Sequence, residues 1–167
     1  MNANNKLSHL VGKIHSAPVF LQSWLLSKLF GRAIKFAGTA GIVIKRLDFQ
    51  QAILVQGNFR KVQNHIGSVH AAAMALLGES ASGFLLGMHV PDDRLPLLKS
   101  MHLDYVKRAT GRLTASAMLS DLQIQQIREQ EKGEITIQVR INDQVGVEPV
   151  IAEYVWAWVP KNRSKSN

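Results

Sequence analysis

The side chains of this sequence that could do chemistry gather in one stretch, residues 64–79. Asn64 opens a polar loop that contains Gly67, and Ser68 and His70 precede an alanine-rich run that predicts a helix carrying one acid, Glu79. Ser68 fits the N-cap of this helix, where its hydroxyl would accept from first-turn amides. The remaining free amides and the helix dipole suit a carbonyl oxygen or an anion.

Glu79 fits the role of a general base. It stands where an apolar residue would be expected, and the small residues around it let another backbone or a ligand come close. A buried carboxylate is costly unless it is hydrogen-bonded, and burial would raise its pKa, which is how a general base is often prepared. The alternative is that Glu79 is simply a solvent-exposed acid on a helix with no catalytic role. His70 and Glu79 are nine residues apart, which places them on opposite sides of a helix and roughly 13 Å apart along its axis. A two-fold dimer would let His70 of one subunit meet Glu79 of the other.

The order Asn64, Gly67, His70, two small residues and Glu79 resembles the hotdog-fold acyl-CoA thioesterases of the phenylacetic-acid-pathway and THEM type. Over residues 15–160 the chain resembles, more narrowly, the hotdog family with a long N-terminal helical segment, domain of unknown function 4442. The resemblance implies that Glu79 is the general base or nucleophile and that Asn64 positions the attacking water or the acid. It also places His70 near the thioester carbonyl, which the amide of Ala71 would polarise. Many relatives have Gly-Gly after the histidine, where this chain has alanines; the amide donor survives that change.

The same resemblance suggests where a substrate lies. We expect the acyl chain between sheet and helix at a dimer interface, near Met74 and Leu77, with Gly67 and Ser68 beside the thioester. Arg60 and Lys61 either meet coenzyme A phosphates or form a solvated strand end.

Each site residue also has a plainer interpretation. Asn64 could cap a turn, Gly67 could serve backbone conformation alone, and His70 could be a satisfied helix-start residue. His65 is expected to be structural or exposed. Its spacing from His70 misses the i, i+4 pattern of helical metal pairs, so we expect no metal site and no cofactor beyond coenzyme A as part of the substrate.

Composition bounds the remaining choices. A chain of 167 residues with 46% hydrophobic residues predicts one folded domain. The lack of cysteine excludes disulfides, thiol nucleophiles and cysteine zinc sites. The net charge of +8 fits nucleic acid, an anionic membrane, a phosphorylated ligand or simply a basic surface. The basic pairs lack interleaved aromatic residues, which argues against nucleic acid. No apolar run reaches the ~18 residues of a membrane span, and the N-terminus lacks the pattern of a signal peptide, so we expect a cytoplasmic protein without stable membrane insertion.

Hydrophobic periodicity predicts the elements that must position the site. We expect helices over 19–31, 68–87 and, from a capping box at Ser120, 120–132, and strands over 39–49, 53–59, 100–106, 112–119, 134–141 and 150–159. One long apolar helix and one sheet must cover each other. This predicts a six-stranded antiparallel sheet wrapped around a central helix, which agrees with the α+β hotdog fold that the resemblance implies. The domain would span 16–160, after a polar segment (1–15) and before a basic, disordered tail (161–167).

Three functions remain open at this point. The first is hydrolysis of acyl-CoA thioesters by a homodimer or a dimer of dimers, and the second is non-catalytic binding of an acyl chain or acyl-CoA. The third is a hydratase or dehydratase of the same fold. The N-terminal helix is expected to pack on the domain, with a flap over an acyl pocket or a membrane-surface anchor as the alternatives.

Overall fold

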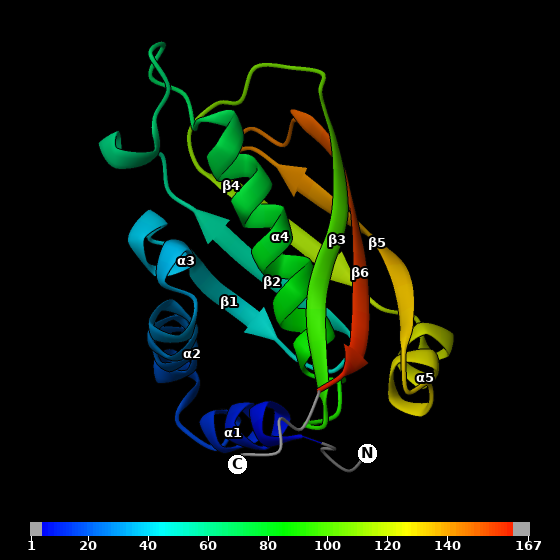
Figure 1. The fold of residues 1–167 in the computed structure, drawn as a ribbon. Coiled ribbons are helices and arrows are strands. Elements are labelled where there is room, and N and C mark those ends of the chain that lie inside the picture. The colour runs from blue at the N-terminus through cyan, green and yellow to red at the C-terminus, as the bar shows by residue number, and fades with distance from the viewer. Residues whose placement is uncertain (1–4, 162–167) are drawn as a thin grey trace, which may run out of the picture.

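A six-stranded antiparallel sheet curls around one long helix, as the sequence predicts (Figure 1). The computed structural model describes residues 5–161. The helices are α1 (Lys6–His15), α2 (Val19–Ala33), α3 (Lys35–Ala40), α4 (Ala71–Gly87) and α5 (Asp121–Glu129), with a 3-10 turn, η1, at Arg60–Val62. The strands are β1 (Val43–Leu47), β2 (Gln51–Gln56), β3 (Arg94–Tyr105), β4 (Leu113–Met118), β5 (Gly133–Asn142) and β6 (Val150–Pro160). Their order in the sheet is β1-β2-β4-β5-β6-β3.

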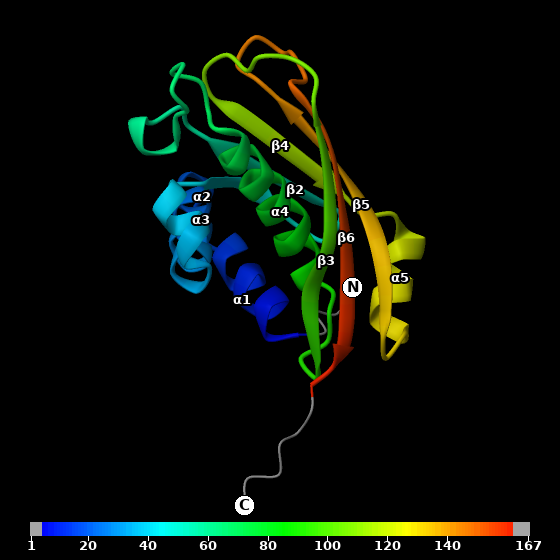
Figure 2. The same cartoon turned by 45° about the horizontal axis from the view of Figure 1, so that its top comes forward.

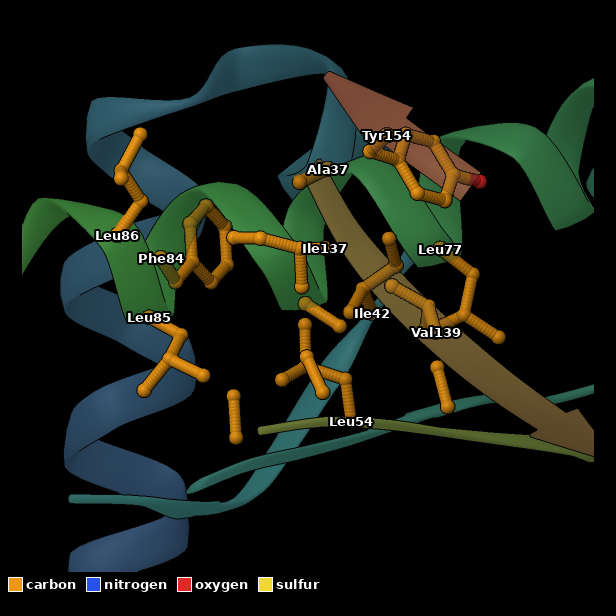
Figure 3. Packing of buried hydrophobic residues seen from close by; sticks show 14 of the residues in the cluster. Ala37, Ile42, Leu54, Leu77, Phe84, Leu85, Leu86, Ile137, Val139 and Tyr154 are labelled. Atoms are coloured by element: carbon orange, nitrogen blue, oxygen red, sulfur yellow. The ribbon is translucent and has the colours of Figure 1, made fainter. Parts of the chain in front are cut away.

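The core lies between the concave face of the sheet and α4. Along β5 every second residue is buried, beginning with Ile135 and Ile137, while the residues between them are exposed. This period of two turns one face of a strand inward. Leu77 and Phe84 of α4 belong to the same buried cluster as Val139 and the other sheet residues (Figure 3). Each such side chain contributes roughly 1.5–3 kcal/mol when it leaves water, so this contact dominates the stability of the fold.

Small residues of α4 make room for the aromatic row of β6. The Tyr154 hydroxyl donates to the Ala75 carbonyl at 2.9 Å, and Trp156 Nε1 donates to Ser82 Oγ at 2.9 Å. A Cβ at Gly78 would stand 2.2 Å from the Tyr154 hydroxyl. The lack of a side chain at Gly78 therefore lets the Tyr154 ring lie directly against the backbone of α4.

The helix α2 packs on the domain and covers the edge of β1, which confirms the expected packing. Ser23 Oγ donates to the Ile44 carbonyl at 2.7 Å, and the Ile44 amide donates to Ser27 Oγ at 2.9 Å. Deeper in, the rings of Phe30 and Phe84 have their centroids 4.3 Å apart. Two hydroxyls of α2 therefore take the place of a neighbouring strand at Ile44.

Several predicted boundaries are wrong. The helix α2 does not end at Gly31 but continues to Ala33, and the predicted strand at 39–49 begins only at Val43 because residues 35–40 form α3. The non-helical backbone of Ile34 separates the two helices, and the left-handed Gly41, with φ of 79°, ends α3. The strand β3 starts six residues before the predicted Ser100, and α5 ends at Glu129 instead of Lys132.

Side chains cap the starts of α1 and α5. Asn5 caps α1, and its Nδ2 donates to the carbonyls of Gly87 (2.8 Å) and Val90 (2.6 Å). The expected capping box of α5 is confirmed, with the Ser120 and Gln123 side chains bonded reciprocally to backbone amides. The start of the polar segment (1–4) and most of the basic tail (162–167) lie outside the described residues.

A buried histidine joins α5 to the end of α4. His89 is fully buried; its Nε2 lies 2.6 Å from the Phe49 carbonyl, and Arg128 lies 3.1 Å from its Nδ1. Burial, with the nearby Arg128 charge, lowers the pKa of His89 to about 4 despite the bond to Phe49. The ring is therefore neutral near pH 7, with Nε2–H donating to Phe49 and Nδ1 accepting from Arg128.

The strand β3 forms one edge of the sheet. It pairs with β6 on one side, and no other strand of residues 5–161 pairs with it on the other. Leu95, Leu97, Met101 and Tyr105 on this strand are each between 44% and 49% exposed.

None of the described helices has the length and apolarity needed to cross a bilayer.

Candidate functional site

The loop before α4 is held by Asn64. Its Oδ1 accepts from the amides of Ile66 and Ser68, both at 3.1 Å, and the Asn64 amide donates to the Ser68 carbonyl at 2.8 Å. Gly67 has a φ of 76°, in the left-handed region that favours glycine. The Asn64 oxygen thus orders the loop, which is the turn-capping role weighed against a catalytic one.

His70, and not Ser68, is the N-cap of α4. His70 Nδ1 accepts from the Ala72 amide at 3.0 Å, and the helix begins at Ala71. The prediction that Ser68 caps a helix starting there is wrong, because Val69 is still extended and forms a bridge with Gln63. Ser68 Oγ instead accepts from Arg108 Nε at 3.3 Å.

The first turn of α4 leaves its first amide available. Within residues 5–161 no group accepts a hydrogen bond from the Ala71 amide. The Ala71 carbonyl accepts from the Tyr105 hydroxyl at 2.9 Å, which ties the helix start to the end of β3. Arg108 adds a second tie through the Ile66 carbonyl at 3.2 Å. A free amide at a helix N-terminus can stabilise a developing oxyanion.

Tyr105 and Arg108 are the residues that sequence reasoning missed as parts of this region. Tyr105 is the last residue of β3, Arg108 lies in the segment that links β3 to β4, and both are remote in sequence from the helix start. No local pattern in the sequence shows that Arg108 reaches the loop before α4.

Glu79 lies half-buried on the outer side of α4. Burial raises the pKa of its carboxyl group. Its carboxylate has neither a salt bridge nor a hydrogen bond with any residue that the structure describes. A partly desolvated, unpartnered carboxylate has the chemical character of a general base.

A pocket of about 280 Å³ opens beside the start of α4. Its lining includes Phe36 from α3, Lys61 from η1, and His70, Ala72 and Leu76 from the α4 region. Residues i, i+4 and i+7 share one face of a helix, and Ala72, Leu76 and Glu79 have this spacing. The α4 wall of this pocket, hereafter the α3–α4 pocket, is thus continuous with the face that carries Glu79.

The other predicted substrate residues lie in different surroundings. Met74 and Leu77 face the sheet and are buried in the core, and Arg60 and Lys61 are exposed on η1. Lys61 and His70 both line the α3–α4 pocket. The structure thus gathers His70, Lys61 and the amide of Ala71 at one end of α4.

Within a single chain, Glu79 lies away from His70, Lys61 and the Ala71 amide. It lies eight residues beyond Ala71 on the same helix, or about 12 Å along the axis. One small carbonyl group could not contact the Ala71 amide and the Glu79 carboxylate of the same copy.

Comparison with known protein families agrees with this architecture. The family described as "Domain of unknown function (DUF4442)" matches residues 22–159. The chain belongs to the DUF4442 family. The match covers the fold from α2 to β6 and includes every residue of the candidate site. A sequence comparison with curated proteins found no match.

Solved structures share the fold of this DUF4442 chain. A Pseudomonas aeruginosa protein of unknown function, described as a probable thioesterase, superimposes with a TM-score of 0.73 at 24% identity, over 81% of this chain and 94% of that one. A mutant thioesterase from the same organism gives 0.67 at 16% identity, covering 81% and 92%. A thioesterase from Haemophilus influenzae gives 0.64 at 10% identity, covering 78% and 86%. At these identities the similarity establishes the hotdog fold.

Proposed function

We propose that this DUF4442 protein hydrolyses acyl-CoA thioesters with Glu79 as general base. The observation that carries the proposal is the half-buried, unpartnered carboxylate of Glu79, whose pKa is raised by burial. It lies on the helix that also begins with an available amide at Ala71. The description of structural relatives as thioesterases supports the same reaction class.

The reaction needs two groups from this chain. The Glu79 carboxylate takes a proton from water as the water oxygen bonds to the thioester carbon, and the Ala71 amide donates to the oxyanion that forms. Collapse of this intermediate breaks the carbon–sulfur bond. The proton held by Glu79 then passes to the departing thiolate, which leaves a carboxylic acid and a thiol. His70 orients the thioester from its position at the cap.

The site is proposed to form between two copies of the chain. The distance along α4 separates the amide and the acid of one copy, so a second copy must supply one of them. The open edge of β3, with its row of half-exposed apolar side chains, is a surface on which a two-fold partner could extend the sheet.

One observation favours the second candidate, a non-catalytic protein that binds acyl-CoA. The Asn64 oxygen already accepts hydrogen bonds from two loop amides, which engages both of its lone pairs, so it is not free to accept a hydrogen bond from the attacking water. The α3–α4 pocket would serve binding equally well with or without turnover.

The test is release of free thiol from acyl-CoAs ranging from acetyl to palmitoyl, with Glu79→Gln beside the wild type. We expect saturable turnover that the substitution lowers ~100-fold or more. Glu153→Gln is the matched control, because Glu153 also comes from a half-buried position but lies on β6 and bonds to Gln138 at 2.5 Å.

The outcomes separate the candidates. Equal turnover by wild type and Glu79→Gln would remove the acid from the mechanism. Saturable binding of acyl-CoAs without turnover at any chain length would establish the binding protein instead. Oligomeric state by light scattering tests the shared site independently, since a monomer with full activity contradicts it.

A further inference from the structure

The excess positive charge of this protein is confined to its first half. Residues 1–78 contain nine Lys and Arg residues and one acid, Asp48, whereas residues 79–167 contain eleven basic and eleven acidic residues. The whole net charge of +8 therefore comes from the segment that forms α1, α2, α3, the first two strands and η1. In both views α2 and α3 lie along the side of the molecule opposite α5 (Figures 1 and 2).

This basic side carries a groove. It has a volume of about 700 Å³ and runs between α2, α3 and the start of β1. Lys28 and Arg32 of α2 and Lys35 of α3 line it, and no acid does. Within the described chain none of the three makes a salt bridge. Three cations without counter-charges form a site for an anion with more than one phosphate.

A close helix contact holds the three cations together. A Cβ at Gly38 would stand 2.3 Å from the carbonyl oxygen of Gly31, so α2 and α3 touch backbone to backbone. Lys28 and Arg32 are four residues apart on one face of α2. The contact at Gly31 brings Lys35 on α3 to the same groove.

The groove also offers an aromatic wall. Trp24 lines it, is 58% exposed, and has the Lys28 ammonium 6.0 Å from its ring centroid. An exposed indole stacks on nucleobases, and neighbouring cations bind the phosphates of the same nucleotide. Lipid phosphates could bind the same cations, but a nucleotide also has a base that can stack on the Trp24 indole in the wall of the groove.

We propose that this groove between α2 and α3 binds the phosphorylated adenosine end of coenzyme A, with Trp24 against the base and Lys28, Arg32 and Lys35 on the phosphates. The identity of the ligand rests on the proposed function. Thr39 lines both this groove and the α3–α4 pocket, so the two hollows meet across α3. A helix of six residues is about 9 Å long, a short crossing for the extended arm that joins nucleotide and thioester.

Titration calorimetry with adenosine 3′,5′-bisphosphate tests the groove without any turnover. We expect saturable binding that Lys28→Glu/Arg32→Glu weakens by about tenfold or more and Trp24→Ala by about fivefold or more. The control Lys132→Glu/Arg140→Glu changes the net charge equally at exposed positions near and on β5, and should leave the affinity within about twofold. Equal weakening by both double variants, or by neither, overturns the proposal.

Kinetics then place the groove in the reaction. We expect Lys28→Glu/Arg32→Glu to lower the preference for an acyl-CoA over the same acyl thioester of N-acetylcysteamine about tenfold, because the truncated substrate lacks the nucleotide. An unchanged preference contradicts the groove. If the wild type hydrolyses neither thioester, the proposed function fails and calorimetry alone decides the groove.

A lipid source of the phosphate is tested with vesicles of phosphatidylcholine and phosphatidylglycerol. Co-sedimentation that the groove variants abolish, in a protein that does not bind the bisphosphate, would overturn the nucleotide assignment. Bisphosphate binding with no retention on vesicles supports it.

Discussion

Replacing Gly78 by alanine tests how tightly α4 is held against β6. A Cβ at this position would stand 2.2 Å from the Tyr154 hydroxyl and 2.6 Å from its Cζ. Tyr154 is fully buried and bonded to the Ala75 carbonyl at 2.9 Å, so it cannot retreat without losing packing and this bond. Overpacking costs ~1–3 kcal/mol and the lost bond roughly 1 kcal/mol, against a gain of ~1 kcal/mol in helix propensity. We expect Gly78→Ala to lower the free energy of unfolding by ~1–3 kcal/mol.

Gly12→Ala is the matched control for this substitution. Gly12 also lies inside a helix, α1, but it is exposed and nothing lies within 4 Å of the Cβ position. There the propensity gain acts alone, and the variant should be ~0.5–1 kcal/mol more stable than the wild type. Urea unfolding followed by circular dichroism measures both. If Gly78→Ala is as stable as Gly12→Ala, the close contact with Tyr154 does not exist in solution.

Three further predictions concern titration and loop structure. Because the pKa of His89 is lowered to about 4, the folded state binds the proton less readily than the unfolded state, and the free energy of unfolding should fall by roughly 2–3 kcal/mol from pH 6.5 to pH 4. In His89→Gln the free energy of unfolding, measured by urea denaturation, should fall much less across this range. Burial raises the pKa of Glu79, so its ionisation destabilises the fold above the raised pKa and not below the ordinary value; Glu79→Gln should therefore be more stable than wild type at pH 7, with the advantage vanishing toward pH 4. Asp143 accepts from the amides of Thr110, Val145 and Val147, and Asp143→Ala should lose roughly 2 kcal/mol in urea unfolding; an unchanged midpoint would mean that water replaces the carboxylate at no cost.

Strong periodicity explains what the sequence predicts well. The alternation of β5, the alanine-rich run of α4 and the capping box at Ser120 are local signals, and the structure confirms all three elements. Glu79 is half-buried and burial raises its pKa, which is the condition under which the sequence makes this acid a candidate general base. These features depend on residues close together in sequence.

The misses depend on contacts between distant segments. Ser68 is of a residue type favoured at N-caps, but the bridge from Val69 to Gln63 keeps the chain extended until His70. The short helix α3 carries Gly38 and Thr39, which favour a loop or strand, and its packing on α2 overrides that preference. The tie from Tyr105 to the helix start needs the sheet to be folded.

The serines of α2 have a consequence for assembly. By occupying the backbone groups of Ile44, Ser23 and Ser27 leave no open partner on β1 at that point, while Lys45 and Arg46 are exposed on the same short strand. A charged, covered edge resists the addition of another strand. Growth of the sheet is thereby restricted to β3. Two copies that join through β3 would each present a sealed end outward, so this mode of association stops at a pair and cannot propagate into a fibre.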